Sequence, residues 1–181
     1  HPLLKGLRPM IQNELEPGWI LQPGFQPVFE AMVEAGLRFD ALVRQHQIDD
    51  IAALAARHPD LPIVLDHCGK PVIASGEIAA WRNSIATLAA YPNVHCKVSG
   101  LWTEAGDDCS ATAIAPYIDV VRAAFGTRRL MWGSDWPVLN LAGSYRDWLD
   151  QALALFADLD IAERAAVFGG NAARFYGLDH D

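Results

Sequence analysis

Five short apolar runs recur along the chain at similar intervals, and each is followed by turn residues and a longer helix-like stretch. The runs cover residues 5–12, 37–44, 61–67, 93–99 and 129–134. Successive runs begin 24 to 36 residues apart, which suits one strand, one helix and two loops. Residues 61–65, Leu-Pro-Ile-Val-Leu, lack polar alternation, as is typical of parallel strands covered on both faces. The pattern predicts an α/β fold with five parallel strands.

The stretches between the runs carry the signals of helices. Large apolar side chains recur on one stripe in residues 48–55 and again in residues 78–88. Ser144 and Asp160 are each followed three residues later by an acidic side chain. This is the spacing of a capping box, and it predicts a helix start at both positions. Residues 171–176 predict a short last helix that a glycine ends.

The number of strand-helix units indicates which parallel fold forms. Complete eight-stranded barrels need about 250 residues, whereas five units occupy 181 residues here. We therefore expect a single domain over residues 1–181 that contains strands 4 to 8 of a (β/α)8 TIM barrel and lacks roughly the first three. An open, doubly wound sheet is the alternative, but no Gly-rich phosphate loop follows any predicted strand.

The amino-acid composition limits the kinds of molecule that the chain is expected to bind. The chain has 14 Lys and Arg against 22 Asp and Glu, and its basic residues are scattered, which argues against a nucleic-acid partner. It contains no run of 18 apolar residues that could span a membrane. Three cysteines without C-x-x-C spacing indicate a reducing, cytoplasmic setting. We expect a small-molecule substrate, and the sequence leaves a homo-oligomer open.

Polar side chains stand at the carboxyl ends of the predicted strands, where ligands meet parallel α/β folds. Asp135, inside Trp-Gly-Ser-Asp-Trp-Pro, predicts a general base or metal ligand, or alternatively an Asp that caps its own turn. His67 predicts a zinc ligand or a group that polarises a carbonyl, with a histidine bonded to a backbone carbonyl as the alternative. His46 holds the same position at its own strand end. Together the three predict a catalytic group gathered from three strands.

Four further residues are candidates for substrate binding. Trp102 and Trp136 directly follow predicted strands, whereas the other tryptophans are expected in the core. Gln12 ends the first apolar run, and Lys70 follows His67 in the chain. All four therefore fall near the strand ends that we expect to surround the site.

Two charged residues inside the strands are expected to have structural roles. Lys97 shares the parity of Ser99, so on a buried face its ammonium would need a carboxylate. Asp66 points to the other side of its strand from His67. We therefore expect Lys97 in a structural ion pair and Asp66 as a partner for a lysine or for the backbone.

Longer motifs carry a resemblance to a known family. They are Val-Leu-Asp-His-Cys-Gly-Lys-Pro (64–71), Asn-Val-His-Cys-Lys-Val-Ser-Gly-Leu (93–101), Arg-Leu-Met-Trp-Gly-Ser-Asp-Trp-Pro-Val (129–138) and Val-Phe-Gly-Gly-Asn-Ala-Ala-Arg-Phe-Tyr-Gly-Leu (167–178). In their order, and over essentially the whole chain, they resemble the amidohydrolase-related lactonase family (amidohydrolase 2), whose members include sugar lactonases. The resemblance implies a distorted (β/α)8 TIM barrel of the metal-dependent hydrolase type.

The resemblance also implies roles for particular residues. The family's histidines on the fifth and sixth strands match His46 and His67, its aspartate on the eighth matches Asp135, and its H-x-H pair on the first strand has no match here. Asp135 would take a proton from water, and both histidines would help to polarise the lactone carbonyl. If zinc is bound, His67 and Asp135 would ligate it; because metal use varies in the family, metal-independent action is also open.

Two other functions stay open on the sequence. A zinc-dependent, non-oxidative decarboxylase of the same superfamily would use a similar set of Asp and His residues. A truncated remnant without the H-x-H pair would be inactive. Release of carbon dioxide would identify the first, and lack of turnover even with zinc would identify the second.

Overall fold

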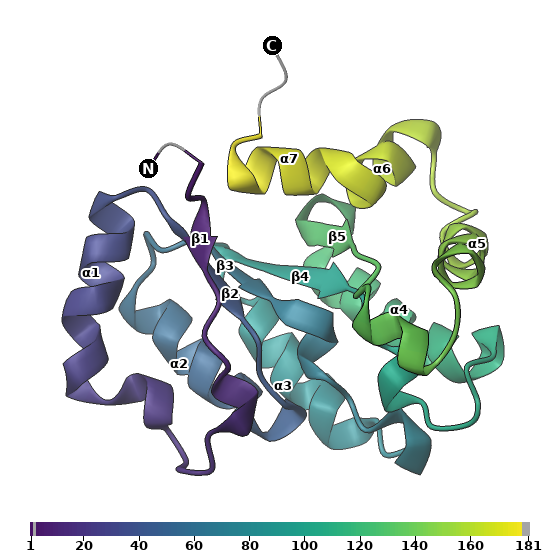
Figure 1. Ribbon diagram of the computed structural model, residues 1–181, viewed down its shortest axis with the longest axis horizontal. Helices are drawn as coiled ribbons and strands as arrows, with labels where there is room; N and C mark the ends of the chain where they lie inside the picture. Colours follow the sequence, from purple (N-terminus) through teal and green to yellow (C-terminus); the bar gives the residue numbers. More distant parts are fainter. Residues whose placement is uncertain (2, 179–181) are drawn as a thin grey trace.

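Five parallel strands form one sheet in the computed structural model, which describes residues 1 and 3–178. The strands are β1 (Gly6–Leu7), β2 (Arg38–Ala41), β3 (Ile63–Leu65), β4 (Val94–Val98) and β5 (Leu130–Trp132). They lie side by side in chain order (Figure 1). A doubly wound sheet would reverse its order at a switch point. The order is therefore that of a (β/α) barrel, and all five predicted strands are confirmed.

The strands are shorter than the apolar runs that predicted them. In the first run, Pro9 has no N–H to give to a neighbouring strand, and β1 ends two residues earlier. The chain then forms a 3₁₀ turn over Ile11–Asn13, which includes Gln12. The turns Gln45–Gln47 and Asp66–Gly69 likewise take His46 and His67 out of their strands. The turns therefore decide where these side chains point.

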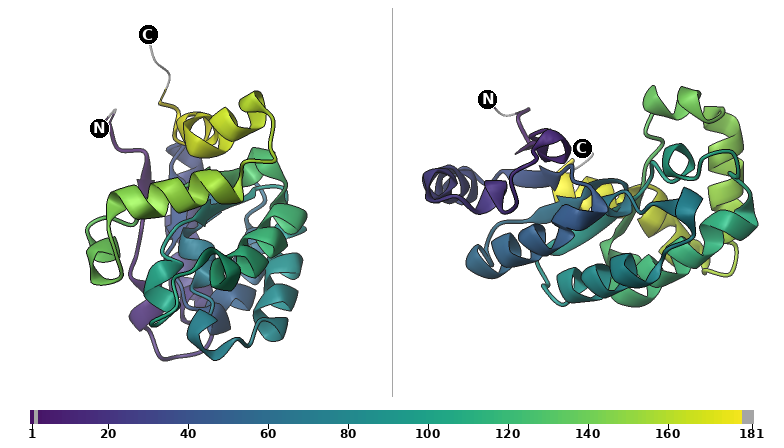
Figure 2. Two further views of the ribbon diagram at one scale, coloured as in Figure 1. Left: turned by 90° about the vertical axis from the view of Figure 1, so that its right-hand side faces the viewer. Right: turned by 90° about the horizontal axis from the view of Figure 1, so that it is seen from below.

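Helices follow the strands, and α1 to α4 cover one face of the sheet. The helices are α1 (Gln26–Glu34), α2 (Ile48–Arg57), α3 (Ala79–Ala89), α4 (Ala111–Phe125), α5 (Tyr145–Leu155), α6 (Ile161–Ala165) and α7 (Asn171–Tyr176). Figure 2 shows α2 and α3 side by side along the sheet. Ser144 and Asp160 cap α5 and α6 as predicted, because each side chain accepts a hydrogen bond from the backbone N–H three residues on. None of the helices among the described residues has the length and apolar character needed to cross a membrane.

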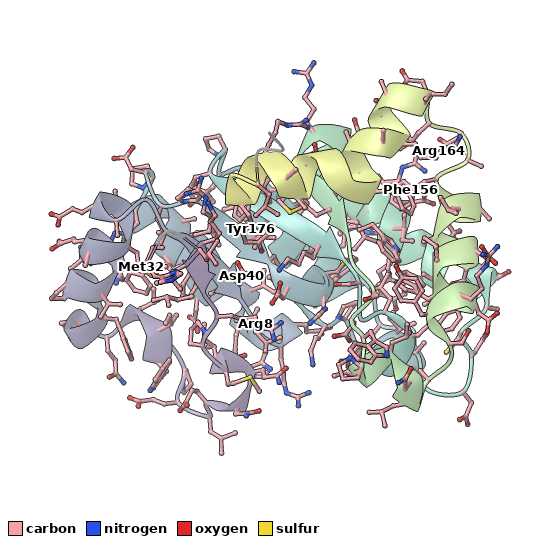
Figure 3. The ribbon with its side chains drawn as sticks, turned by 45° about the horizontal axis from the view of Figure 1, so that its top comes forward. Arg8, Met32, Asp40, Phe156, Arg164 and Tyr176 are labelled. Atoms are coloured by element: carbon pink, nitrogen blue, oxygen red, sulfur yellow. The ribbon has the colours of Figure 1, made fainter. Side chains whose placement is uncertain are left out.

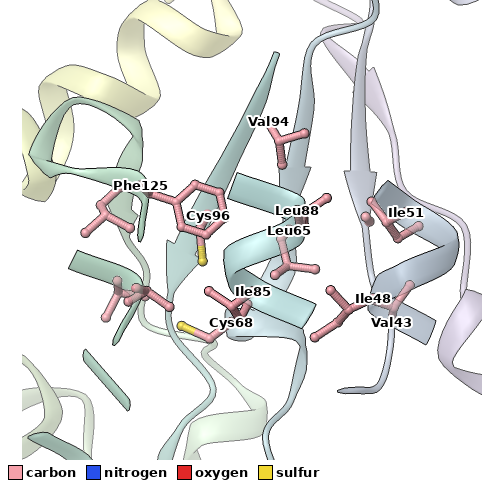
Figure 4. Close-up of a cluster of buried hydrophobic side chains, with 14 of the residues drawn as sticks. Val43, Ile48, Ile51, Leu65, Cys68, Ile85, Leu88, Val94, Cys96 and Phe125 are labelled. Carbon is pink, nitrogen blue, oxygen red and sulfur yellow. The ribbon is translucent and has the colours of Figure 1, made fainter. Parts of the chain in front are cut away.

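The main hydrophobic core lies between the sheet and these helices. The register of the sheet pairs Leu65 with Cys96 and places both side chains toward the helices. Ile51 of α2 and Ile85 of α3 pack against this layer, and all four residues are fully buried (Figure 4). This core accounts for the apolar stripes of the predicted helices.

The opposite face of the sheet, here called the inner face, is covered at one end by α7. Phe175 packs with Val64 and Met131 in a second, smaller cluster. The Arg38 Nε atom donates to the Phe175 carbonyl at 2.5 Å, which ties α7 to the amino end of β2. Beyond this cluster the inner face is charged, and the hydroxyl of Tyr176 donates to Asp40 Oδ2 at 2.7 Å (Figure 3). The inner face therefore has an apolar end and a charged middle.

Candidate active site

The chain leaves β3 through an unusual left-handed turn that carries His67. Four successive residues have positive φ angles: His67 (53°), Cys68 (52°), Gly69 (69°) and Lys70 (51°). Each non-glycine residue in this region costs about 1 kcal/mol or more, so contacts from elsewhere must hold the turn. The Trp81 indole N–H donates to the Cys68 carbonyl at 2.8 Å, and the indole is buried. Strain that packing holds in place is common at functional sites.

Asp135 stands in a second strained turn, which follows β5. Its φ angle is 58°, and its carbonyl accepts a hydrogen bond from the Leu139 N–H at 3.0 Å. The Asp135 Oδ1 atom lies 3.5 Å from His67 Nε2, and the two side chains are only 13% and 9% exposed. Because β4 separates β3 from β5, this contact crosses an intervening strand. The structure thus brings together two of the three residues that we expected to form the catalytic group.

The loop after β4 supplies the other contacts of the His67 ring. Buried Ser99 places its Oγ atom 2.8 Å from His67 Nδ1. Gly100 lies against the same ring, because a Cβ atom on Gly100 would come within 2.8 Å of His67 Cγ. In the sequence, the parity of Ser99 with Lys97 is the one signal of an inward side chain.

Burial sets the protonation of His67. Removal from water lowers the pKa of His67 below its ordinary value, and the nearby carboxylates of Asp66 and Asp135 offset this only in part. The ring is therefore neutral at pH 7 and carries one N–H. A ring that donates from Nε2 toward Asp135 leaves Nδ1 free to accept the Ser99 hydroxyl. In this tautomer Nδ1 accepts a hydrogen bond from Ser99, and the Nε2–H faces the Asp135 carboxylate at a distance longer than a usual hydrogen bond.

His46 does not join this pair. Its side chain is exposed and lines a small pocket on the surface together with Glu14, Glu16 and Asp50. The neighbouring Gln47 turns inward instead, where its amide donates to the Ile11 carbonyl at 2.9 Å. Because the buried Gln47 fixes the turn, His46 is directed to the surface. The expectation that two histidines flank Asp135 is therefore corrected.

The predicted binding residues have different surroundings. Trp136 directly follows Asp135 and is 64% exposed. The Lys70 Nζ atom lies 3.7 Å from Glu104 Oε1, and both side chains are partly exposed. Gln12 is half-buried, and its Oε1 atom has no hydrogen-bond partner among the described residues. Lys70 and Trp136 thus keep polar or aromatic groups accessible, whereas the Gln12 Oε1 atom is buried.

Trp102 was expected to be a binding residue but is buried. Its indole N–H donates to Gln151 Oε1 at 2.7 Å, and its ring packs edge-on against Trp148. Gly143 makes this packing possible, because a Cβ atom there would lie 2.3 Å from Trp102 Cζ3. Trp102 is therefore a core residue that packs the segment after β4 against α5.

The site supplies too few donors for a zinc ion by itself. Catalytic zinc in proteins is held by three protein ligands and a water molecule. His67 and Asp135 offer an imidazole nitrogen and a carboxylate. Among residues 1 and 3–178, no group of three His, Cys, Asp or Glu side chains is placed to hold a metal ion. The described residues thus provide two of the donors that zinc requires.

Known proteins resemble this chain along nearly its whole length. The profile of the family described as amidohydrolase matches residues 1–178. The L-fucono-1,5-lactonase of Burkholderia ambifaria is 46% identical over 184 residues, which are 98% of this chain and 63% of that protein. The chain thus spans less than two thirds of the length of this curated relative.

Solved structures give the same picture. An amidohydrolase from Burkholderia multivorans with bound zinc has a TM-score of 0.92 and 38% identity, over 97% of this chain and 65% of its own. A 2,6-dihydroxybenzoate decarboxylase from Rhizobium shares the fold alone, with a TM-score of 0.60 and 16% identity over 90% of this chain and 58% of its own. The first two relatives therefore bear more closely on the site than the decarboxylase.

Proposed function

Because the chain belongs to the amidohydrolase family, we propose that its site hydrolyses a lactone by means of Asp135 and His67. The observation that supports this most is the contact between a carboxylate and a neutral imidazole across β4, in a site that is largely shielded from water. The name of the relative from B. ambifaria, L-fucono-1,5-lactonase, supports a sugar lactone as the substrate.

The proposed reaction adds water to the ester carbonyl. The Asp135 carboxylate accepts a proton from water as the water oxygen bonds to the carbonyl carbon. The N–H of His67 donates to the carbonyl oxygen, on which negative charge develops. The ring C–O bond then breaks, and the ring oxygen takes the proton from Asp135, so that the product is a hydroxy acid. The 3.5 Å between Nε2 and Oδ1 exceeds the usual hydrogen-bond length, so both groups can turn to the substrate.

No step of this reaction passes through a metal ion, because His67 and Asp135 supply fewer donors than catalytic zinc uses. The zinc-bound relative supports a metal in the family. In this chain a zinc site would need at least one ligand beyond the described residues, whereas the metal-independent route uses groups that the chain contains.

The substrate would lie between Trp136 and Lys70. The exposed indole of Trp136 offers an apolar face to a sugar ring. Lys70 and Glu104, whose side chains are partly exposed, offer a donor and an acceptor to ring hydroxyls.

We propose that residues 1–181 form one domain equivalent to strands 4 to 8 of a (β/α)8 barrel, which the chain order of the strands supports. We also propose a cytoplasmic location. The free thiols of Cys68, Cys96 and Cys109 support it, because such thiols persist in a reducing compartment.

Proton release from a panel of neutral sugar lactones tests the proposed function. The chain should release one proton per lactone, with no carbon dioxide, and with or without a metal chelator. Asp135→Asn should lower kcat by about 100-fold or more, as expected for loss of a general base. Asp150→Asn, a surface change in α5, is the control and should leave kcat unchanged. A folded wild-type chain without turnover, or a fully active Asp135→Asn variant, would contradict the proposal.

A further inference from the structure

A largely buried lysine on the inner face contacts carboxylates from two other strand ends. The Lys97 Nζ atom, on β4, lies 2.7 Å from Asp40 Oδ2 on β2 and 2.8 Å from Asp66 Oδ1 at the end of β3. Asp66 is completely buried, whereas the Asp40 side chain is 14% exposed. The ion pair that we expected for Lys97 is thus present, but it has two carboxylates.

Only one of these carboxylates belongs to the turn that carries His67. Asp66 is the first residue of the 3₁₀ turn Asp66–Gly69 and directly precedes His67. The residues that follow in the turn also contact the segment after Lys97. The Lys97 carbonyl accepts a hydrogen bond from the Cys68 thiol at 3.3 Å, and Ser99 contacts the His67 ring. Lys97 and Ser99 therefore brace three successive residues of the turn.

We infer that Lys97 is a positioning residue of this site, whose ammonium acts through Asp66 to hold the left-handed turn that directs His67 toward Asp135. The inference rests on the proposed function of the His67 and Asp135 site. Lys97 touches neither of these side chains in the contacts described above, so its effect must pass through Asp66.

Arg8 is a second cation near Asp66, and it explains why the charge of Lys97 matters for the position of this carboxylate. The Arg8 Nη1 atom lies 3.5 Å from Asp66 Oδ2, and the Arg8 side chain is 53% exposed. Without Lys97, the buried carboxylate of Asp66 would keep Arg8 as its cation among the described contacts, and it would turn toward this exposed side chain. A carboxylate that is buried without a partner is costly, so the backbone of the strained turn would move with it.

The charge of Lys97 is well secured. Burial by itself lowers the pKa of Lys97, but the carboxylates of Asp66 and Asp40 outweigh it and hold this pKa above its usual range. Lys97 is therefore charged at neutral pH. The formal charges of this group of side chains sum to zero, since it has two cations, Arg8 and Lys97, and two acidic residues, Asp40 and Asp66. This balance allows the charged groups to lie close together on the inner face.

Asp40 provides the matched control. Asp40→Asn and Asp66→Asn each leave Lys97 one carboxylate at hydrogen-bond distance. If Lys97 only stabilises the fold, the two variants should behave alike. If Lys97 positions His67 through Asp66, the variants should differ at the His67 ring.

The test compares Asp40→Asn, Asp66→Asn and Lys97→Met in the full chain by NMR and urea unfolding. At about pH 8, where histidine is neutral, the wild-type chain should show NOEs from the His67 ring to Ser99 and Gly100. Asp66→Asn and Lys97→Met should lose them, and Asp40→Asn should keep them. With a lactone that the wild-type chain hydrolyses, Asp66→Asn and Lys97→Met should each have a kcat about 100-fold below that of wild type. The kcat of Asp40→Asn should stay within about 3-fold of wild type.

Several outcomes would overturn the inference. They are retention of the His67 NOEs in folded Asp66→Asn or Lys97→Met, and their equal loss in Asp40→Asn. If Lys97→Met does not fold, the two Asn variants decide the question alone. If the wild-type chain hydrolyses no lactone, the proposed function fails, while the NOE comparison still decides whether Lys97 positions His67.

Discussion

Gly100 and His67 are in such close contact that a methyl group on Gly100 would lie 2.8 Å from the Cγ atom of the ring. Gly100 also has a φ angle of 63°, which side chains rarely adopt. The glycine therefore serves two purposes, since it permits the turn after β4 and leaves room for the imidazole. Together with the Ser99 hydroxyl, it fixes the ring from one side.

Gly100→Ala should displace His67 and abolish most of the activity. The added methyl cannot be accommodated without movement of the ring, and a displacement of about 1 Å at a reacting group can cost about 100-fold in rate. Gly76→Ala is the matched control, because Gly76 has a φ angle of 70° and no described atom within 4 Å of the added methyl. Both variants should lose about 1 kcal/mol of unfolding free energy from the backbone strain. Equal kcat values for the two variants would show that the contact with His67 is unimportant.

Trp81→Phe should destabilise the chain through the left-handed turn. The indole N–H is the hydrogen-bond donor to the buried Cys68 carbonyl, and phenylalanine cannot replace it. The unpaired carbonyl should cost about 1–3 kcal/mol of unfolding free energy in urea titrations. Trp136→Phe, at an exposed position, should change the same quantity by less than about 0.5 kcal/mol. Similar losses in the two variants would contradict this role of Trp81.

His95 should make the fold sensitive to acid. Burial, and then the nearby charge of Arg129, lower its pKa from 6.5 to about 4. Between these values the unfolded chain binds a proton that the folded chain does not, so stability is lost as the pH falls from about 6.5 toward 4. Allowing for partial exposure, the loss should be about 2–3 kcal/mol.

Urea unfolding of wild type and His95→Gln at several pH values isolates this contribution. The variant should lose less stability than wild type across the same interval, because glutamine does not titrate. Other histidines, such as His58, contribute equally to both proteins and cancel in the difference. Parallel curves for the two proteins would show that His95 does not titrate abnormally.

Zinc should bind this chain only weakly. His67 and Asp135 are two donors, and an open site with two protein ligands falls short of the three of catalytic zinc sites. In a competition titration, a metallochromic indicator should retain zinc in the presence of the chain. A stoichiometric complex that withdraws zinc from the indicator, and that Asp135→Asn abolishes, would contradict this expectation.

The elements of the fold and their order can be read from local patterns in the amino-acid sequence. The spacing of apolar residues and the residues that cap helices are local features, because each involves positions only a few residues apart. For this reason the five strands, the helix starts after Ser144 and Asp160, and the bounds of α7 were all predictable. The ion pair of Lys97 was predictable as well, because a buried ammonium requires a carboxylate.

Which polar strand ends meet depends on contacts between distant parts of the chain. His46 and His67 hold equivalent positions in the sequence, yet one is exposed and the other is buried beside Asp135. The difference comes from the turns, since inward Gln47 directs His46 outward and the left-handed turn directs His67 inward. The dihedral angles of such turns depend on contacts with residues about 30 positions away, such as Ser99. A pattern of period two along a strand carries no information about them.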